Sequence, residues 1–472
     1  MFSALKNTIA IILMSIIIMF PLCAAYGTEN DDFIPYCISV TFDGDVQSCR
    51  GFTWYTDNPC ASDLLLAEDS IDKLSEYGAA RLYQGSSTQL QRYTGRNAIK
   101  KQFSMHRLAL TELKADTSYV YKLGDAGRGI WSQPGTFHTA ARDKSFSFII
   151  VADSQVEDAE DFMHTARVLD SAVQTLPKAD FLIHLGDFVQ SYSSEGSFEN
   201  FAEWQGFFAS AQKELMNTTI LPVAGNHDMS NNVFCNHFAL DKLTPVNANT
   251  ETGVYYAVNY GNSCFMVLNT NEGYQNGSGS ISQEQLEWLK STAAKADQRG
   301  VKWKILLIHR AIYSFGRHMD SEDIIALRAQ LAPLISDLGI DLVLQGHDHV
   351  YMRSKVLFKS ASGQIIPQIG GTELIDQLWA GDKINFAVNP PGTSYIIPNL
   401  IGRQYGSRII SRTVQVYPEA SYKPDDNDDP VFAGITIEGH RLVYRAYVYE
   451  QEGNGQVKEI DRYAILKDNG KL

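Results

Sequence analysis

The sequence predicts two folded domains, an all-β domain over residues 33–142 and an α/β domain that begins at residue 145. Short strand candidates separated by glycine and polar turns fill the first region, which is the pattern of a β-sandwich. In the second region, short apolar runs alternate with segments of helical spacing, which is typical of a sheet flanked by helices. The length of 472 residues and the hydrophobic content of 44% fit a globular protein with a large core.

Residues 1–25 predict a secretory signal peptide rather than part of the fold. Lys6 precedes an apolar stretch that ends at Phe20, and small residues then lead to the expected cleavage position at the end of this segment. The stretch is shorter than the ~20 apolar residues of a membrane span, so an uncleaved anchor is the second choice. A lipoprotein signal is disfavoured because bulky Leu22 precedes Cys23. We therefore expect a secreted, periplasmic or cell-surface protein without membrane attachment after cleavage.

The strand candidates of the first domain are short and bounded by turn residues. They cover residues 37–42, 51–56, 80–83, 107–113, 119–123 and 136–139. The run over residues 110–121 resembles a segment of fibronectin type III domains, with Tyr119 in the position of a tyrosine corner. We therefore expect residues 33–142 to form a fibronectin III-like sandwich that supports the second domain.

Polar motifs follow five apolar runs of the second domain, at residues 146–151, 181–185, 219–223, 305–308 and 340–344. The motifs are Asp153-Ser154-Gln155, Gly186-Asp187, Gly225-Asn226-His227-Asp228, His309 and Gly346-His347-Asp348-His349. Ligands bind beyond the carboxyl ends of strands in open α/β sheets, so these side chains should converge on one rim. Carboxylates, an amide and imidazoles together suit Mn, Fe or Zn rather than calcium.

The order of these motifs resembles that of the calcineurin-like metallophosphoesterases, and within them the purple acid phosphatase branch. The resemblance implies a central β-sandwich flanked by helices over residues 145–355, with two divalent metal ions. Asp187 would bridge the two ions. The resemblance assigns Asp153 and His349 to the first ion and Asn226, His309 and His347 to the second.

The same resemblance implies substrate-facing groups. His227 would assist the leaving oxygen, with Asp228 to fix its tautomer. His318 lies nine residues after His309, where plant purple acid phosphatases carry a histidine for phosphate contact or proton donation. Asn226, His227 and His318 are therefore the expected substrate-binding residues, and His227, Asp228 and His318 the expected catalytic ones. His184, which precedes Gly186-Asp187, is expected to be a buried, hydrogen-bonded residue rather than a ligand.

Two positions depart from the family pattern. Gln190 stands where the purple enzymes carry the tyrosine whose charge transfer to ferric iron gives the colour, so no purple colour is expected. Gln155 stands where the wider superfamily often has a histidine. As a metal ligand it would offer a carbonyl oxygen, and an oxygen-rich first site favours Mn or Fe over Zn.

The remaining segments complete the predicted domain. Helical spacing covers residues 162–176 and 201–215, Ser282 with Gln285 forms a capping box, and a further helix should run from Ser321 to Gly339 with a kink at Pro333. Residues 356–428 give no clear period and are interpreted as an insertion able to cap the site. Residues 429–472 alternate as a hairpin that would complete the catalytic domain.

Charge and cysteine content restrict the partners. The net charge of −14 argues against nucleic acid as a partner, because phosphate backbones select basic surfaces. It is compatible with a small-molecule phosphate ester, because bound cations dominate the local field. An odd number of cysteines remains after the signal segment, so at least one thiol is unpaired. The hypothesised pairs are Cys235 with Cys264 and one among Cys37, Cys49 and Cys60.

The expected function is that of an exported dimetal phosphoesterase, in which a metal-bridging hydroxide attacks a phosphomonoester in line. One alternative is a phosphodiesterase or nucleotide pyrophosphatase that uses the same site. The other is a non-catalytic surface binding or adhesion protein with a decayed site. The oligomeric state is left open.

Overall fold

The computed structural model describes residues 31–467 with gaps at residues 77, 95–98, 143–144, 191–200, 230–231, 276, 369–371, 404–416, 423–428 and 452. The predicted signal segment, residues 1–25, lies outside the described residues. None of the helices in the described ranges is long and apolar enough to cross a membrane.

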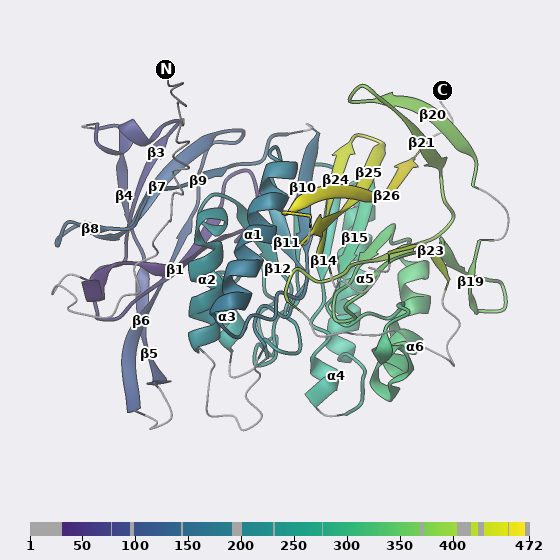
Figure 1. Ribbon diagram of the computed structural model, residues 1–472, viewed down its shortest axis with the longest axis horizontal. Coiled ribbons are helices and arrows are strands. Elements are labelled where there is room, and N and C mark those ends of the chain that lie inside the picture. Colours follow the sequence, from purple (N-terminus) through teal and green to yellow (C-terminus); the bar gives the residue numbers. More distant parts are fainter. Residues whose placement is uncertain are drawn as a thin grey trace, which may run out of the picture.

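One 12-stranded sheet runs through both predicted domains (Figure 1). Its spatial order is β20 (Leu374–Trp379), β21 (Asp382–Val388), β26 (Gln456–Leu466), β25 (Arg441–Glu450), β24 (Val431–Glu438), β10 (Phe146–Val151), β11 (Phe181–His184), β12 (Thr219–Pro222), β1 (Tyr36–Thr41), β2 (Arg50–Thr56), β6 (Ile99–Leu110) and β5 (Ser86–Thr94). Strands β10, β11 and β12 are parallel, and β1 joins β12 in parallel at Thr41 and Ile220. The N-terminal domain therefore extends the sheet of the second domain.

A seven-stranded sheet forms the other layer of the second domain. Its order is β13 (Tyr256–Tyr260), β14 (Ser263–Val267), β15 (Trp303–Leu307), β16 (Leu342–Leu344), β22 (Ser394–Pro398), β17 (Tyr351–Ser354) and β23 (Pro418–Tyr422). Strands β14, β15, β16 and β22 are parallel. Strand β22 comes from residues 356–428, so part of the segment expected as an insertion belongs to the sheet itself. The same segment supplies the hairpins β18 (Leu357–Lys359) with β19 (Ile365–Pro367) and β20 with β21.

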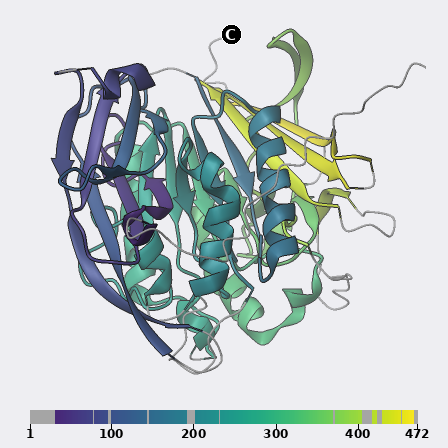
Figure 2. The same cartoon turned by 60° about the vertical axis from the view of Figure 1, so that its left-hand side comes forward.

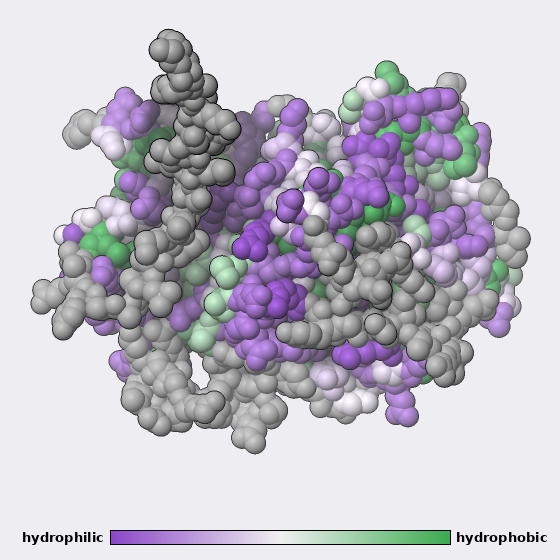
Figure 3. All heavy atoms as spheres, in the orientation of Figure 1, coloured by the Kyte–Doolittle hydropathy of each residue, from purple (hydrophilic) through white to green (hydrophobic). Residues whose placement is uncertain are grey.

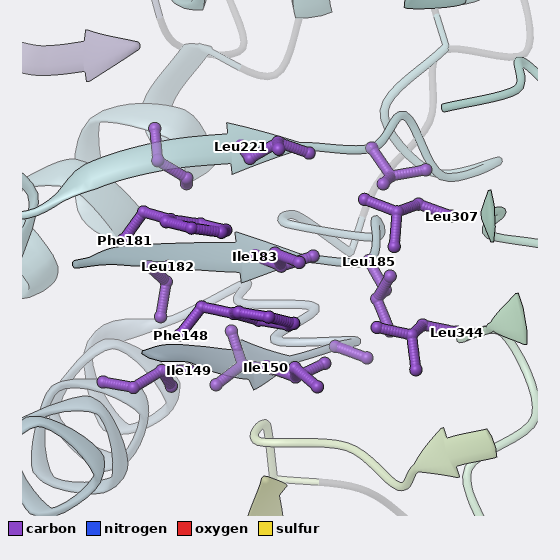
Figure 4. Close-up of a cluster of buried hydrophobic side chains, with 14 of the residues drawn as sticks. Phe148, Ile149, Ile150, Phe181, Leu182, Ile183, Leu185, Leu221, Leu307 and Leu344 are labelled. Atoms are coloured by element: carbon purple, nitrogen blue, oxygen red, sulfur yellow. The ribbon is translucent and has the colours of Figure 1, made fainter. Parts of the chain in front are cut away.

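The core lies between these two sheets. The ring of Phe148 on β10 meets the ring of Phe265 on β14 edge to face, with centroids 5.2 Å apart. Figure 4 shows Phe148 and Phe181 stacked within this layer and Leu185, Leu307 and Leu344 at its far end. Leu185 immediately precedes Gly186-Asp187, and Leu307 and Leu344 stand two residues before His309 and Gly346, so the site rests directly on the packed core.

Helices cover the outer faces of the two layers. Helices α1 (Ala159–Thr175) and α2 (Phe201–Leu215) pack on the first sheet, and α5 (Gln283–Gln298) and α6 (Glu322–Asp337) pack on the second (Figure 1). The shorter α3 (Val233–His237) and α4 (Glu272–Gln275) lie in connections. Helix α5 begins as predicted, because Ser282 Oγ accepts the backbone N–H of Gln285 at 3.3 Å. The central sandwich flanked by helices is confirmed.

A second layer completes the N-terminal domain, which stands beside the second domain in Figure 2. It consists of β4 (Arg81–Gln84), β3 (Asp63–Glu68), β7 (Ser118–Asp125), β8 (Ile130–Trp131) and β9 (Gly135–His138). Phe52 and Trp54 from β2 pack against Leu64 and Tyr121 from this layer. The Tyr119 hydroxyl accepts the backbone N–H of Lys114 at 2.9 Å, which is the tyrosine corner expected from the sequence.

Arg50 joins the two domains through a fully buried guanidinium. Its Nε donates to Thr219 Oγ1 at 3.2 Å, at the start of β12. Its Nη1 donates to the carbonyl oxygens of Val46 at 2.8 Å and Cys49 at 2.7 Å, and Nη2 donates to that of His138 at 2.5 Å. All three guanidinium nitrogens are thus engaged, as a buried charge requires.

The expected disulfides are wrong. In the described part of the chain, no disulfide joins any two of Cys37, Cys49, Cys60, Cys235 and Cys264. Cys235 packs against the hydrophobic cluster that includes the residues of α2, whereas Cys264 belongs to a separate cluster with the residues of α5 and α6. The two thiols therefore lie in different parts of the core.

The face shown in Figure 3 is mostly hydrophilic, in keeping with the net charge of −14. Hydrophobic residues gather at its upper right, where Figure 1 places the hairpin of β20 and β21. Leu374 and Leu378 of this hairpin are 60% and 71% exposed.

Candidate metal centre

The five polar motifs converge at the carboxyl ends of β10, β11, β12, β15 and β16. Asp187 lies at the centre, with its Oδ2 atom 3.2 Å from His309 Nε2. One ligand atom each from Asp187, His309 and His347 fall within 4.8 Å of one another, and all three residues are buried. The sequence-predicted ligands thus form one cluster although their motifs are spread over some two hundred positions of the chain.

Asp153 and His349 form one side of the cluster. Asp153 Oδ1 lies 3.4 Å from His349 Nε2. The same carboxylate accepts the backbone N–H of His347, at 3.0 Å to Oδ1 and 3.1 Å to Oδ2. The turn after β16 is therefore held by hydrogen bonds to the Asp153 carboxylate, which lies in the turn after β10.

Asn226 and His309 form the other side. His309 Nδ1 lies 2.8 Å from the carbonyl oxygen of Leu185, to which it donates. This hydrogen bond fixes the tautomer and directs Nε2 towards Asn226 Oδ1 at 3.1 Å and Asp187 Oδ2 at 3.2 Å. An imidazole held in this way is oriented as a metal ligand.

The electrostatics of the buried cluster favour a cation at its centre. Burial alone would raise the pKa of Asp187, but the His309 and His227 imidazoles hold it well below its usual range. Burial alone would lower the pKa of His309, but the Asp187 charge raises it to about 9. Burial holds the pKa of His347 well below its usual range, so this imidazole keeps a lone pair for a metal.

The donor set fits a divalent ion, because Asp187, His309 and His347 each present one ligand atom to the same point. The Asp153–His349 and Asn226–His309 contacts supply further donors beside this group. Carboxylate, amide and imidazole donors suit Mn, Fe or Zn.

The ligand turns require unusual backbone conformations. Asp153, Asp187 and His347 have φ values of +53°, +57° and +69°, in the left-handed region. The glycines of the motifs have no Cβ atom, which lets the neighbouring ligand turns approach them closely. A Cβ atom on Gly225 would lie 2.1 Å from Asp187 Oδ1, and one on Gly346 would lie 2.9 Å from Asp153 Oδ2.

The structure corrects the role expected for Asp228. Its carboxylate accepts three backbone N–H groups, those of Asp187, Phe188 and Gly225, each at 2.8 Å. The Nδ1 atom of His227 is instead hydrogen-bonded to the carbonyl oxygen of Gln190, which fixes the His227 tautomer. Burial and the Asp187 charge raise the pKa of Asp228 to about 7, against the three amide donors. Asp228 therefore stabilises the turns that carry the proposed ligands and does not orient the His227 imidazole.

His227 and His318 lie at the open rim of the cluster, with side chains 18% and 29% exposed. His227 Nε2 is 3.9 Å from Asp187 Oδ2. The His318 ring stacks on the His347 ring with centroids 4.2 Å apart. The structure thus places both expected substrate-facing histidines at the rim of the candidate metal centre.

Gln155 is also brought to the centre, but in a different role. Its Nε2 donates to Asp187 Oδ2 at 3.1 Å, so the amide supports the central carboxylate. Its backbone N–H donates to the carbonyl oxygen of Asp187 at 3.0 Å. Gln155 therefore ties the turn after β10 to the turn after β11.

Ser154 and His184 support the turns that follow β10 and β11. His184 Nδ1 accepts the N–H of Gly186 at 3.2 Å, and His184 Nε2 lies 3.0 Å from Ser154 Oγ. Burial lowers the pKa of His184 to about 3, so the ring is neutral. His184 is thus the buried, hydrogen-bonded residue expected from the sequence. The supporting role of Ser154 was not foreseen, because a serine in a turn carries no signal of its partner.

Comparison with known proteins agrees with this geometry. Residues 146–351 match the family model of calcineurin-like phosphoesterases, and residues 35–139 match that of the purple acid phosphatase N-terminal domain. The chain is 23% identical over 335 residues to purple acid phosphatase 18 of Arabidopsis thaliana, covering 69% of this chain and 68% of that protein.

It is also 26% identical over 271 residues to purple acid phosphatase 1 of Ipomoea batatas, covering 53% of this chain and 52% of that protein. The second match therefore spans about half the length of that relative. A solved structure of PhoD superposes with a TM-score of 0.56 at 13% identity, covering 95% of each chain. That likeness concerns the fold.

Proposed function

We propose that this chain, which belongs to the calcineurin-like phosphoesterases and carries the N-terminal domain of the purple acid phosphatases, is an exported, metal-dependent phosphomonoesterase. The observation that carries the proposal is that Asp187, His309 and His347 each present a ligand atom within 4.8 Å of the others, with Asp187 Oδ2 3.2 Å from His309 Nε2. The substrate class is a small-molecule phosphate ester, and inorganic phosphate is one product.

Each side of the cluster would hold one divalent ion. Asp153 and His349, with Gln155 close by, would hold the first, and Asn226, His309 and His347 the second, with Asp187 shared. When bound, two such ions supply a nucleophilic water at neutral pH and neutralise charge on the phosphoryl group. The buried carboxylates and the fixed His309 tautomer keep the donors in place.

The rim histidines would act on the substrate. Water oxygen joins phosphorus as the bond to the leaving oxygen breaks, and the leaving oxygen must gain a proton. His227 has Nδ1 fixed on the Gln190 carbonyl, so Nε2 is directed to the substrate side. His318 offers a second ring at the same rim and, with Asn226, completes the group of side chains available to the phosphate.

Export rests on residues 1–25, which carry the pattern of a signal peptide. N-terminal sequencing of the mature protein from its native source would test this part of the proposal. A mature chain that starts at residue 26 supports it, and a chain that retains residues 1–25 contradicts it.

Hydrolysis of an aryl phosphomonoester and of the matching diester tests the activity. Residues 26–472 would be loaded with Mn, Fe or Zn and assayed from about pH 4 to about pH 9. Asn226→Ala serves as the control that lacks one ligand. Monoester turnover that disappears in the variant supports the proposal. Turnover of the diester alone would contradict the monoesterase assignment, and equal background from both proteins would favour a binding protein.

A further inference from the structure

Asp348 lies between two of the proposed ligands, His347 and His349, but its own carboxylate faces His318. Asp348 Oδ1 is 2.8 Å from His318 Nδ1 and 3.3 Å from the backbone N of His318. The residue is only 2% exposed. The last motif of the sequence thus contains, between its two histidines, a carboxylate directed to a third.

The approach of the two residues depends on Gly316. A Cβ atom at this position would lie 2.5 Å from Asp348 Cγ, so a larger residue would push the turn away. His318 itself sits in the short 3-10 helix η3 (Arg317–Asp320), and Ser321 Oγ donates to the His318 carbonyl oxygen at 2.6 Å. The turn that carries His318 is therefore supported on both sides of the histidine.

The His318 ring is fixed in three ways. Its Nδ1 faces Asp348, one face stacks on His347 with an interplanar angle of 29°, and Nε2 accepts Arg317 Nε at 3.1 Å. A carboxylate on Nδ1 selects the tautomer that leaves Nε2 as the outward atom. The side chain is 29% exposed at the rim, where an ester would replace Arg317 Nε on this outward atom.

The contrast with Asp228 argues for a role beyond backbone support. Asp228 uses both oxygens on three backbone amides. Asp348 directs one oxygen to an imidazole, and its Oδ2 is buried without a hydrogen-bond partner within the described ranges. A carboxylate needed only to hold a turn would satisfy both oxygens, because leaving one unpaired costs stability.

We propose that Asp348 is a positioning residue that orients the His318 imidazole so that Nε2 faces the ester. The inference rests on the proposed phosphomonoesterase function, in which His318 contacts the substrate. Its consequence concerns specificity, because esters with poor leaving groups depend most on a well-placed group near the leaving oxygen. Alkyl phosphates should therefore depend on Asp348 more than aryl phosphates do.

The test is a double-mutant cycle with Asp348→Ala and His318→Ala, assayed on an alkyl and an aryl phosphomonoester. Asp348→Ala should lower kcat/KM for the alkyl ester by about 10–100-fold, and Asp348→Asn, which still offers an acceptor oxygen to Nδ1, should restore part of the loss. In the His318→Ala background, Asp348→Ala should have no further effect. Equal losses in both backgrounds would overturn the proposal, as would a loss fully explained by lower metal content.

Two further measurements make the result decisive. Ser321→Ala loosens the same turn without touching the ring, so a loss equal to that of Asp348→Ala would assign Asp348 a merely structural role. The ¹⁵N shifts of the His318 ring in the metal-free protein report the tautomer without any turnover. A proton on Nδ1 in the wild type and mixed tautomers in Asp348→Ala support the proposal even if no ester is hydrolysed. An unchanged tautomer would overturn it.

Discussion

Asp228 accepts the backbone N–H of Asp187 at 2.8 Å, so one buried carboxylate holds the turn that presents another. The two acids are each 1% exposed and belong to different motifs. Their different roles follow from the groups that their carboxylate oxygens contact. Asp187 Oδ2 faces the His309 imidazole at 3.2 Å, and its Oδ1 accepts the backbone N–H of His227 at 2.8 Å, whereas both oxygens of Asp228 accept backbone amides. The acid that follows His227 in the sequence therefore supports the turn of a proposed metal ligand.

Asp228→Asn should destabilise the protein by about 2–4 kcal/mol, because an amide NH2 would face backbone N–H groups and leave them unpaired. Chemical denaturation measures the change. His227→Gln is the matched control, since it alters the rim histidine without removing the two carboxylate oxygens that accept these three N–H groups. It should keep wild-type stability while losing activity. Equal stability of Asp228→Asn and wild type would show that the three amides are supported in another way.

Gly225→Ala should abolish metal binding, because its Cβ would lie 2.1 Å from Asp187 Oδ1. Metal content by elemental analysis measures the effect. Gly300→Ala is the control, since Gly300 has a φ of +69° but no neighbour within 4 Å of its Cβ position. It should cost about 1 kcal/mol of stability from backbone strain and leave metal content unchanged. Full metal content in Gly225→Ala would mean that the turn can move without releasing the ligands.

Iron-loaded protein should lack the visible charge-transfer band of a tyrosinate bound to ferric iron, because Gln190 occupies the position of that tyrosine. The Gln190 carbonyl is engaged with His227, and its backbone N donates to Glu203 Oε2 at 3.0 Å. The absorption spectrum of the oxidised, iron-loaded protein is the measurement. A strong visible band that survives in Asn226→Ala but not after iron removal would reveal a tyrosine ligand from elsewhere in the chain.

Arg50→Lys should destabilise the junction of the two domains by about 3 kcal/mol, because an ammonium group cannot reach acceptors on β12, on β9 and in the turn before β2 together. Thermal unfolding measures the loss. Arg128→Lys is a suitable control, since that side chain is half exposed and pairs with Asp125 at 3.4 Å. It should change stability by less than about 1 kcal/mol. Comparable effects of the two substitutions would show that the buried arginine contributes nothing particular to the junction.

Local patterns predicted the elements that carry the site. The run over residues 146–151 is β10 as the structure has it, and helices α5 and α6 begin directly after the predicted Ser282 and Ser321. Strand β22 was missed because Ser394–Pro398 is short and lies among proline and glycine residues. Such a segment is too short to reveal an alternation of apolar and polar residues. Strand β3 was missed because its Leu-Leu-Leu-Ala stretch alternates too little to indicate a half-buried strand.

The residues of the site, too, could be predicted only in part from the sequence. The ligand positions follow from their places after strands, because parallel strands bring their carboxyl ends to one rim. The partners of Asp228 and Asp348 could not be predicted, because they depend on side-chain directions set by contacts distant in sequence. The single parallel pairing of Thr41 with Ile220, which merges two sheets, likewise leaves no pattern in the sequence.

The pairing of β10 with β24 has a consequence for how the chain matures. Strand β10 begins at residue 146, but the strand that covers its free edge begins at residue 431. During synthesis, most of the chain must emerge from the ribosome before that edge can be closed, and an uncovered β edge is open to pairing with other chains. Premature termination before residue 431 would therefore leave an aggregating fragment rather than a smaller enzyme.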